Sequence, residues 1–376
     1  MKGRTGVAYY IYCFLALGLA VVNVLYSYRI REERKLFRVA VNKDFYEGRH
    51  FIKHMFLLGL GASAITTLLG VVLPKHLVFL WVGASLLPLL SAGVVSLGSW
   101  ALLGAGIVYY VGSWLGRSSF FADTHIHGTW EAGFFLLVVV YYGSKLLLTH
   151  NVRAEWFSPR IKAGKRGRRV AYYHWREFTI LPVVIFLPQG HMQPLFSWWP
   201  VLNFQGNHYT LLVLPLVVTA VLNVSKRLPH ESITTYQQEL RWLLGLAVIM
   251  LGITWFFPQA FPYLGSLLLV IELVWGIKRR RLERQAPNWY VETNQGVRVI
   301  AVQPETPAAK MNLQPGDIIL ECNNIPVGSE EELYSALQKN PVYCHLKVET
   351  YTGDLKIKES AIYTDSPHEI GLILFH

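Results

Sequence analysis

The sequence predicts a multi-span α-helical membrane protein of about eight to nine transmembrane helices, followed by a small C-terminal α+β domain. Of its 376 residues, 52% are hydrophobic and only 16% are charged, a composition too apolar for a soluble protein of this length. Through position 287 there are 29 basic and 12 acidic residues, against 6 basic and 12 acidic residues after it. The two regions therefore differ in the sign of their net charge, and we predict that the first spans the membrane and the second is a separate small domain.

Apolar stretches long enough to cross the hydrocarbon core, which takes about 20 helical residues, recur along the first region. They cover 7–28, 54–73, 76–97, 99–116, 131–148, 209–225, 241–257 and 260–277. A further stretch, 177–198, is interrupted by Pro182, Pro188 and Pro194, so it is kinked, re-entrant or short. We therefore predict a transmembrane domain over 1–277, a basic linker over 278–289 and a separate domain over 290–376.

The basic residues predict the orientation of these spans, because Lys and Arg concentrate in cytoplasmic loops. Eight lie between 29 and 53, eight between 153 and 176, and five in the run KRRRLER that follows the last span. This alternation requires nine crossings, including 177–198, with the C-terminus in the cytoplasm. Basic residues expected to face lipid headgroups or a partner are Arg166, Arg168, Arg169, Lys278, Arg279, Arg280 and Arg281.

Few ionisable residues lie within the predicted spans, where such residues often mark function. Lys145 and Glu272 fall near predicted cytoplasmic helix ends, and we expect their side chains to extend to the membrane interface. Asp123, His125 and His127 have an acid-x-His-x-His spacing, but no fourth ligand is in view. Neither a metal site nor a cofactor is predicted.

The region after Pro287 changes to short alternating runs, turn residues and one short helix, SEEELYSALQ, which Ser329 can cap together with Glu332. The stretch 296–337 resembles bacterial PDZ domains. The matching residues are Thr306, Pro307, Ala308, Ala309, Leu313, Pro315, Gly316, Asp317, Ile318, Ile319, Asn323, Pro326, Leu333 and Leu337. Asn324 stands where the family usually has glycine in a tight turn, and asparagine tolerates the positive φ that such a turn requires.

PDZ domains bind extended peptides at a sheet edge and hold the peptide carboxylate on a loop with an apolar-Gly-apolar signature. No such loop precedes Gly296, and the candidate lies at the very end of the chain. This order predicts a circularly permuted domain whose last strand receives the peptide. The predicted groove residues are Ile370, Gly371, Leu372, Leu374, Leu333 and Leu337; the structural alternative is that these leucines only fill the core.

Enzymatic motifs are missing from the sequence. An intramembrane metalloprotease needs His-Glu-x-x-His, which does not occur, and the segments around Ser63 and Ser85 only approach a serine-protease elbow. We therefore predict that the protein is not an enzyme. The alternative is a secondary transporter or channel-like protein with a regulatory PDZ domain, since proline-broken spans can mark substrate sites. A PDZ-regulated membrane protease is a less favoured alternative.

The whole-chain plan combines a basic first loop beginning RIREERKLF, many spans, a basic run and one C-terminal PDZ-like domain. This plan resembles the MinJ-type cell-division topological determinants of Gram-positive bacteria. The resemblance rests on motif residues in the C-terminal domain and on the order of segments in the membrane half. The resemblance implies a scaffold, enriched at septa and poles, that links DivIVA to the inhibitor pair MinC and MinD in division-site selection. Membrane lipids and a peptide or C-terminal tail of a partner are the expected ligands, and nucleic acid is not expected.

Overall fold

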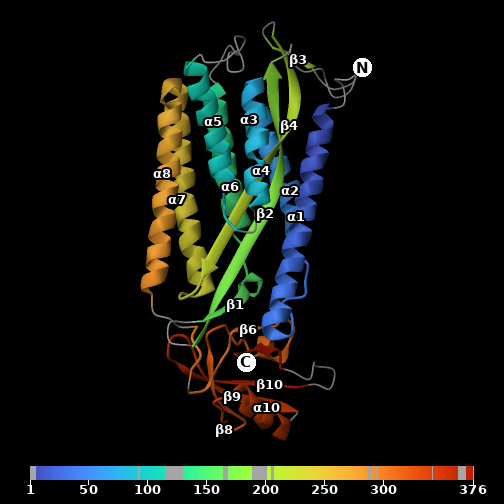
Figure 1. The fold of residues 1–376 in the computed structure, drawn as a ribbon, viewed down its shortest axis with the longest axis vertical. Helices are drawn as coiled ribbons and strands as arrows, with labels where there is room; N and C mark the ends of the chain where they lie inside the picture. The colour runs from blue at the N-terminus through green and yellow to red at the C-terminus, as the bar shows by residue number, and fades with distance from the viewer. Residues whose placement is uncertain are drawn as a thin grey trace.

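The computed structural model describes residues 6–91, 94–115, 130–163, 168–188, 201–204, 207–286, 290–293, 295–340, 342–362 and 370–375. An elongated membrane domain stands on a small C-terminal domain (Figure 1). We call the end of the membrane domain that meets the C-terminal domain the basal end. Asp123, His125, His127, Arg166 and Pro194 lie outside the described residues.

The membrane domain is built from helices of very different lengths. They are α1 (Gly6–Phe37), α2 (Tyr46–Leu68), α3 (Lys75–Ala84), α4 (Leu86–Leu90), α5 (Gly98–Leu115), α6 (Trp130–Leu148), α7 (Pro229–Phe256) and α8 (Phe261–Gln285). Among the described residues, five helices are long and apolar enough to cross a membrane: α1, α2, α6, α7 and α8. The α1 helix begins at the end opposite the C-terminal domain (Figure 1).

The single helix predicted over 76–97 is wrong, because this stretch contains α3 and the short α4. Pro88 explains why α4 does not continue α3. Its nitrogen has no hydrogen to donate to the carbonyl of Ala84, and its ring crowds that carbonyl. The Ser85 hydroxyl donates to the carbonyl of Trp81 at 2.8 Å, a local bond that competes with the helical pattern at this point.

A long antiparallel hairpin runs through the membrane domain among the helices (Figure 1). Its strands are β2 (Arg169–Pro188) and β4 (Asn207–Val224), extended by β1 (Ser158–Ala163) and β3 (Val201–Phe204) in the order β1-β2-β4-β3. The helix predicted over 209–225 is therefore wrong, and 177–188 is a strand as well. Both strands are rich in β-branched and aromatic residues. Burial on both faces gives a continuous apolar run that hydropathy does not distinguish from a helix.

The prolines that interrupt these runs lie where a strand tolerates them. Pro182 and Pro215 face each other on one rung of the ladder. The Pro182 carbonyl accepts a hydrogen bond from the Ser63 hydroxyl of α2 at 2.8 Å, so the polar groups of this rung face the outer edges of the hairpin. A proline has no N–H to leave unpaired there.

Side-chain hydroxyls complete the hydrogen bonding of other outward-facing carbonyls. Thr66 donates to the carbonyl of Val184 at 2.6 Å, and Ser96 donates to the carbonyl of Thr219 at 2.6 Å. Non-helical backbone is tolerated at membrane depth only where it is enclosed by protein and satisfied in this way. The surrounding helices therefore provide the environment that the hairpin needs.

A buried ion pair joins two helices next to the hairpin. Lys145 of α6 lies 3.6 Å from Glu272 of α8, and the lysine side chain is only 2% exposed. Lys145 also donates to Ser96 at 3.1 Å, and Tyr142 donates to Glu272 at 3.1 Å. The expectation that Lys145 reaches the membrane interface is wrong, because these partners hold its ammonium group inside the bundle.

The C-terminal domain is a small α+β unit. Its elements are β5 (Val297–Arg298), β6 (Ala301–Val302), α9 (Pro307–Lys310), β7 (Ile318–Cys322), β8 (Ile325–Pro326), α10 (Glu330–Lys339), β9 (Tyr343–Glu349), β10 (Leu355–Ala361) and β11 (Leu372–Ile373). The main sheet has the order β10-β9-β7-β5, and β11 pairs with β6. The predicted cap is confirmed, since the Ser329 hydroxyl accepts from the Glu332 N–H at 3.2 Å. Asn324 has the predicted positive φ, +65°.

Candidate functional site

The centre of the candidate site is the edge of β11 that pairs with no other strand among the described residues, which we call the open edge. Strand β11 pairs antiparallel with β6, and the carbonyls of Gly371 and Ile373 accept hydrogen bonds from the β6 side at 2.9 and 2.8 Å. Because polar groups alternate along a strand, those of Leu372 and Leu374 face away from β6. An extended peptide can add to this edge.

Gly371 is required where β11 begins. Its φ is +84°, and a Cβ atom at this position would overlap the side chain of Thr306. Thr306 is buried, and its hydroxyl donates to the carbonyl of Gln303 at 2.7 Å, so it has little freedom to move away. Only glycine satisfies both the backbone conformation and the close approach.

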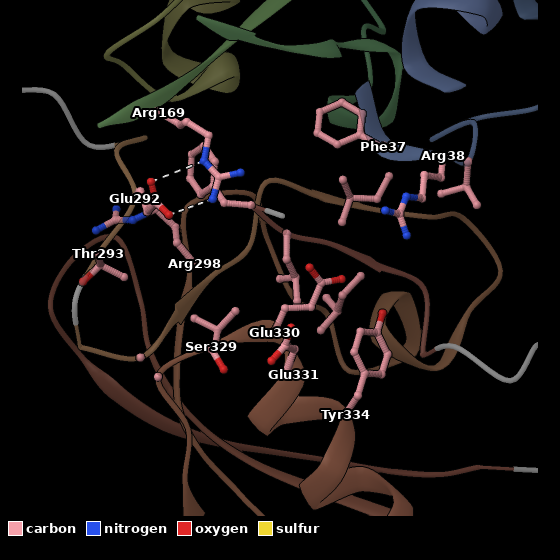
Figure 2. Close-up of a pocket in the computed structure, with 18 residues that line it drawn as sticks. Phe37, Arg38, Arg169, Glu292, Thr293, Arg298, Ser329, Glu330, Glu331 and Tyr334 are labelled. Carbon is pink, nitrogen blue, oxygen red and sulfur yellow. Dashed lines mark hydrogen bonds and ion pairs between the residues drawn. The ribbon is translucent and has the colours of Figure 1, made fainter. Parts of the chain in front are cut away.

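A cavity of about 690 Å³ lies beside the open edge, within the size range of ligand pockets. One wall is β11 and the residues after it, and another is the first turn of α10. The remaining walls come from the start of β5, the first residue of β2 and the end of α1, so both domains enclose the cavity (Figure 2).

The five apolar groove residues that we predicted all belong to the buried core cluster of the C-terminal domain, and two of them also border the cavity. Leu372 and Leu374 line the cavity. Ile370, Leu333 and Leu337 are buried in the core cluster of the C-terminal domain and are not among the cavity residues.

The α10 side of the cavity comes instead from residues that the sequence analysis missed, chiefly Glu330 and Tyr334. Their spacing was the available signal. Residues four apart lie on one helix face, so Glu330 and Tyr334 had to face the same side.

The predicted basic residues also have different surroundings. Arg169 forms an ion pair with Glu292 at 2.8 Å across the two domains, and the guanidinium lowers the pKa of Glu292 through this hydrogen bond. Arg279 pairs with Glu239 and lies over the ring of Tyr236 at 4.7 Å. Of the basic residues that we predicted, four are exposed at the basal end: Arg168, Lys278, Arg280 and Arg281.

Direct hydrogen bonds hold the C-terminal domain against the basal end. The Tyr173 hydroxyl of β2 donates to the carbonyl of Ile300 at 2.6 Å, and the Gln303 side chain donates to the carbonyl of Ala40 at 3.0 Å. The rings of Tyr173 and Tyr290 pack edge to face with centroids 4.8 Å apart. These contacts fix β6, and with it β11, relative to the membrane domain.

The loop between α1 and α2, residues 38–45, borders the cavity and is itself held by buried charges. Arg29 donates to Glu47 at 2.6 Å and to the carbonyl of Asn42 at 2.6 Å. Glu33 accepts from the N–H of Val41 at 2.9 Å. Buried charges that are fully paired in this way resist rearrangement, so the α1–α2 loop presents a fixed surface to the C-terminal domain.

Replacing Tyr173 with phenylalanine should loosen this docking. The change leaves the buried Ile300 carbonyl without its donor, at a cost of about 1–3 kcal/mol. We expect faster hydrogen exchange of residues 299–303 in the purified protein, measured by mass spectrometry. Tyr172→Phe is the matched control, because neighbouring residues of a strand point to opposite faces, and the half-buried Tyr172 ring lies near the ammonium group of Lys162, at 5.3 Å. Equal exchange in both variants would contradict this role of Tyr173.

Comparison with known proteins agrees with this description. Residues 298–350 match the family model for the PDZ domain. Fold and site together define a membrane protein that carries a PDZ domain beside a shared cavity.

The relatives narrow this class further. The "Probable cell division topological determinant MinJ" of Lacticaseibacillus paracasei is 31% identical over 271 residues, which cover 69% of each chain. The "Cell division topological determinant MinJ" of Bacillus subtilis (strain 168) is 27% identical over 378 residues, covering 94% of this chain and 90% of that protein. The chain belongs to the MinJ family of cell division topological determinants.

Proposed function

We propose that this protein is a membrane-embedded scaffold in the spatial control of bacterial cell division, which recruits partners by binding peptides to its PDZ domain. The observation that carries this proposal is the open edge of β11 beside a cavity of about 690 Å³. A sheet edge of this kind binds extended peptides through main-chain hydrogen bonds. The partners that we propose are DivIVA and the MinC/MinD pair, in accordance with the role implied by the family.

We further propose that the PDZ domain is circularly permuted and lies in the cytoplasm. The pairing of the last described strand with β6 supports the permutation. The exposed Arg168, Lys278, Arg280 and Arg281 at the basal end support the orientation, since basic residues favour the cytoplasmic side and anionic headgroups. We keep 1–277, 278–289 and 290–376 as the proposed membrane domain, linker and PDZ domain.

We propose recruitment without catalysis. Among its described residues, the cavity wall contains neither histidine nor cysteine, the side chains most often used as bases and nucleophiles. Anchoring the PDZ domain at a membrane raises its effective concentration for other membrane-bound partners. A modest peptide affinity is therefore sufficient for a scaffold.

The proposal is tested by the position of the protein in dividing cells. A short epitope tag is added to the N-terminus and detected by immunofluorescence, because β11 lies close to the C-terminus and α1 begins at the end of the membrane domain opposite the PDZ domain. We expect enrichment at septa and poles, with labelled MinD at the same sites. A chain ending at residue 289 should remain in the membrane but lose MinD enrichment. Uniform membrane fluorescence of the full chain would contradict the proposed role.

A further inference from the structure

We infer that the peptide groove is a two-part site, in which Arg38 of the membrane domain recognises an acidic side chain of the bound peptide. This inference rests on the proposed peptide binding and adds a specificity determinant from outside the PDZ domain. Phe37, Arg38 and Val39 line the same cavity as Leu372 and Leu374. Figure 2 shows Phe37 and Arg38 across the cavity from Glu330 and Tyr334.

The direction of a bound peptide determines which of its residues meets Arg38. A peptide that pairs antiparallel with β11 has its carboxylate near Gly371, where the strand begins. Its preceding residues then run along Leu374 and Phe375, which border the cavity together with Arg38. Arg38 therefore contacts a side chain upstream of the C-terminal residue and not the carboxylate itself.

The charges around the cavity leave Arg38 available for a ligand. Arg169 is paired with Glu292 at 2.8 Å, and Glu330 is a further acidic neighbour of Arg169. Arg298 is half-buried, with Glu349 as its acidic neighbour. Among the described residues Arg38 has no ion-pair partner, and its side chain is exposed. It is thus the lining cation whose charge an acidic ligand can satisfy.

The backbone of Arg38 gives a second reason to assign it a function. Its φ is +61°, the left-handed conformation that commonly ends a helix and usually belongs to glycine. Arginine in this conformation costs about 1 kcal/mol. Because the paired charges of Arg29 and Glu33 hold the loop that follows, the position of Arg38 beside the groove is set before a peptide binds.

The test uses the full chain in lipid nanodiscs and a phage-displayed library of random eight-residue peptides with free C-termini. We expect the wild-type protein to enrich Asp or Glu upstream of the last three residues. Arg38→Gly suits the left-handed backbone and removes only the side chain, so its pool should lose this enrichment and keep the preference at the last residue. Arg38→Lys, which keeps the charge, should resemble the wild type.

Arg34→Gln is the matched control, because it removes one exposed positive charge from the last turn of α1, just before Arg38, and Arg34 does not line the cavity. A recovered acidic peptide is compared with the same peptide in which the upstream Asp or Glu is replaced by Asn or Gln. The wild type and the Arg34→Gln control should bind the acidic peptide about three- to fivefold more tightly than the neutral one. Arg38→Gly should bind the two peptides equally. An unchanged preference in Arg38→Gly would overturn the inference while peptide binding stands. If no variant enriches any sequence, the proposed peptide binding itself fails and the inference with it.

Discussion

Replacing Gly371 with alanine is expected to destabilise the PDZ domain by about 3 kcal/mol and to abolish peptide binding. The left-handed backbone accounts for about 1 kcal/mol of this loss, and the overlap of the new methyl group with Thr306 accounts for the rest. Because the Gly371 carbonyl accepts a hydrogen bond from Gln303 at 2.9 Å, the shift that relieves the overlap also disturbs the pairing of β11 with β6.

Gly353→Ala separates the two causes. Gly353 has nearly the same φ, +83°, but no atom lies within 4 Å of the position of its Cβ, so only the backbone strain of about 1 kcal/mol applies. It lies in the exposed turn between β9 and β10.

Opening of the domain can be measured through the buried Cys322 and Cys344, after the exposed Cys13 is changed to serine. The rate of thiol labelling follows the population of the open form. We expect an increase of more than about a hundredfold for Gly371→Ala and about fivefold for Gly353→Ala. Equal increases would contradict the role of Thr306.

Replacing Lys145 with methionine should destabilise the membrane domain by about 3–5 kcal/mol, because Glu272 would remain in the bundle without its partner. The Ser96 hydroxyl, which joins Lys145 to the hairpin, would lose a donor as well. The thermal unfolding midpoint of the purified protein in detergent measures the effect. Lys278→Met is the matched control, because Lys278 is exposed at the basal end of α8.

The double variant Lys145→Met with Glu272→Met tests whether the unpaired charge causes the loss. Two apolar residues of similar length can replace a buried ion pair with little change in stability, so the double variant should recover most of the midpoint. A loss equal to the sum of the two single variants would contradict coupling between Lys145 and Glu272.

The C-terminal domain illustrates how well local chemistry predicts local structure. Ser329 is the cap of α10, and Asn324 has a positive φ, because both depend on a few neighbouring residues. The predicted groove residues occupy two kinds of position in the structure. Leu333, Leu337, Leu372 and Leu374 are all buried in one core cluster, but of these four leucines only Leu372 and Leu374 also line the cavity. Sequence spacing does not distinguish an apolar residue at a groove from one beneath it.

In the membrane half, hydropathy alone does not distinguish a buried strand from a transmembrane helix. The stretch 209–225 is apolar enough for a helix, yet it is a strand paired with β2. A strand at this depth needs partners for every outward-facing polar group. Some of those partners lie far away in the sequence, as Ser63 does from Pro182, 119 positions apart.

The sequence by itself determined the membrane class and the basic character of the segments next to the C-terminal domain, because composition acts over short distances. It also contained the motif residues through which the C-terminal domain resembles PDZ domains. Only the tertiary structure decided that two apolar runs form a hairpin, that Lys145 is buried and that Arg38 borders the groove. Each of these depends on contacts between remote segments, such as the hydrogen bond that joins Gln303 to Ala40 across 263 positions. The sequence contains the residues for such contacts, but the packing of the whole chain selects which of them meet.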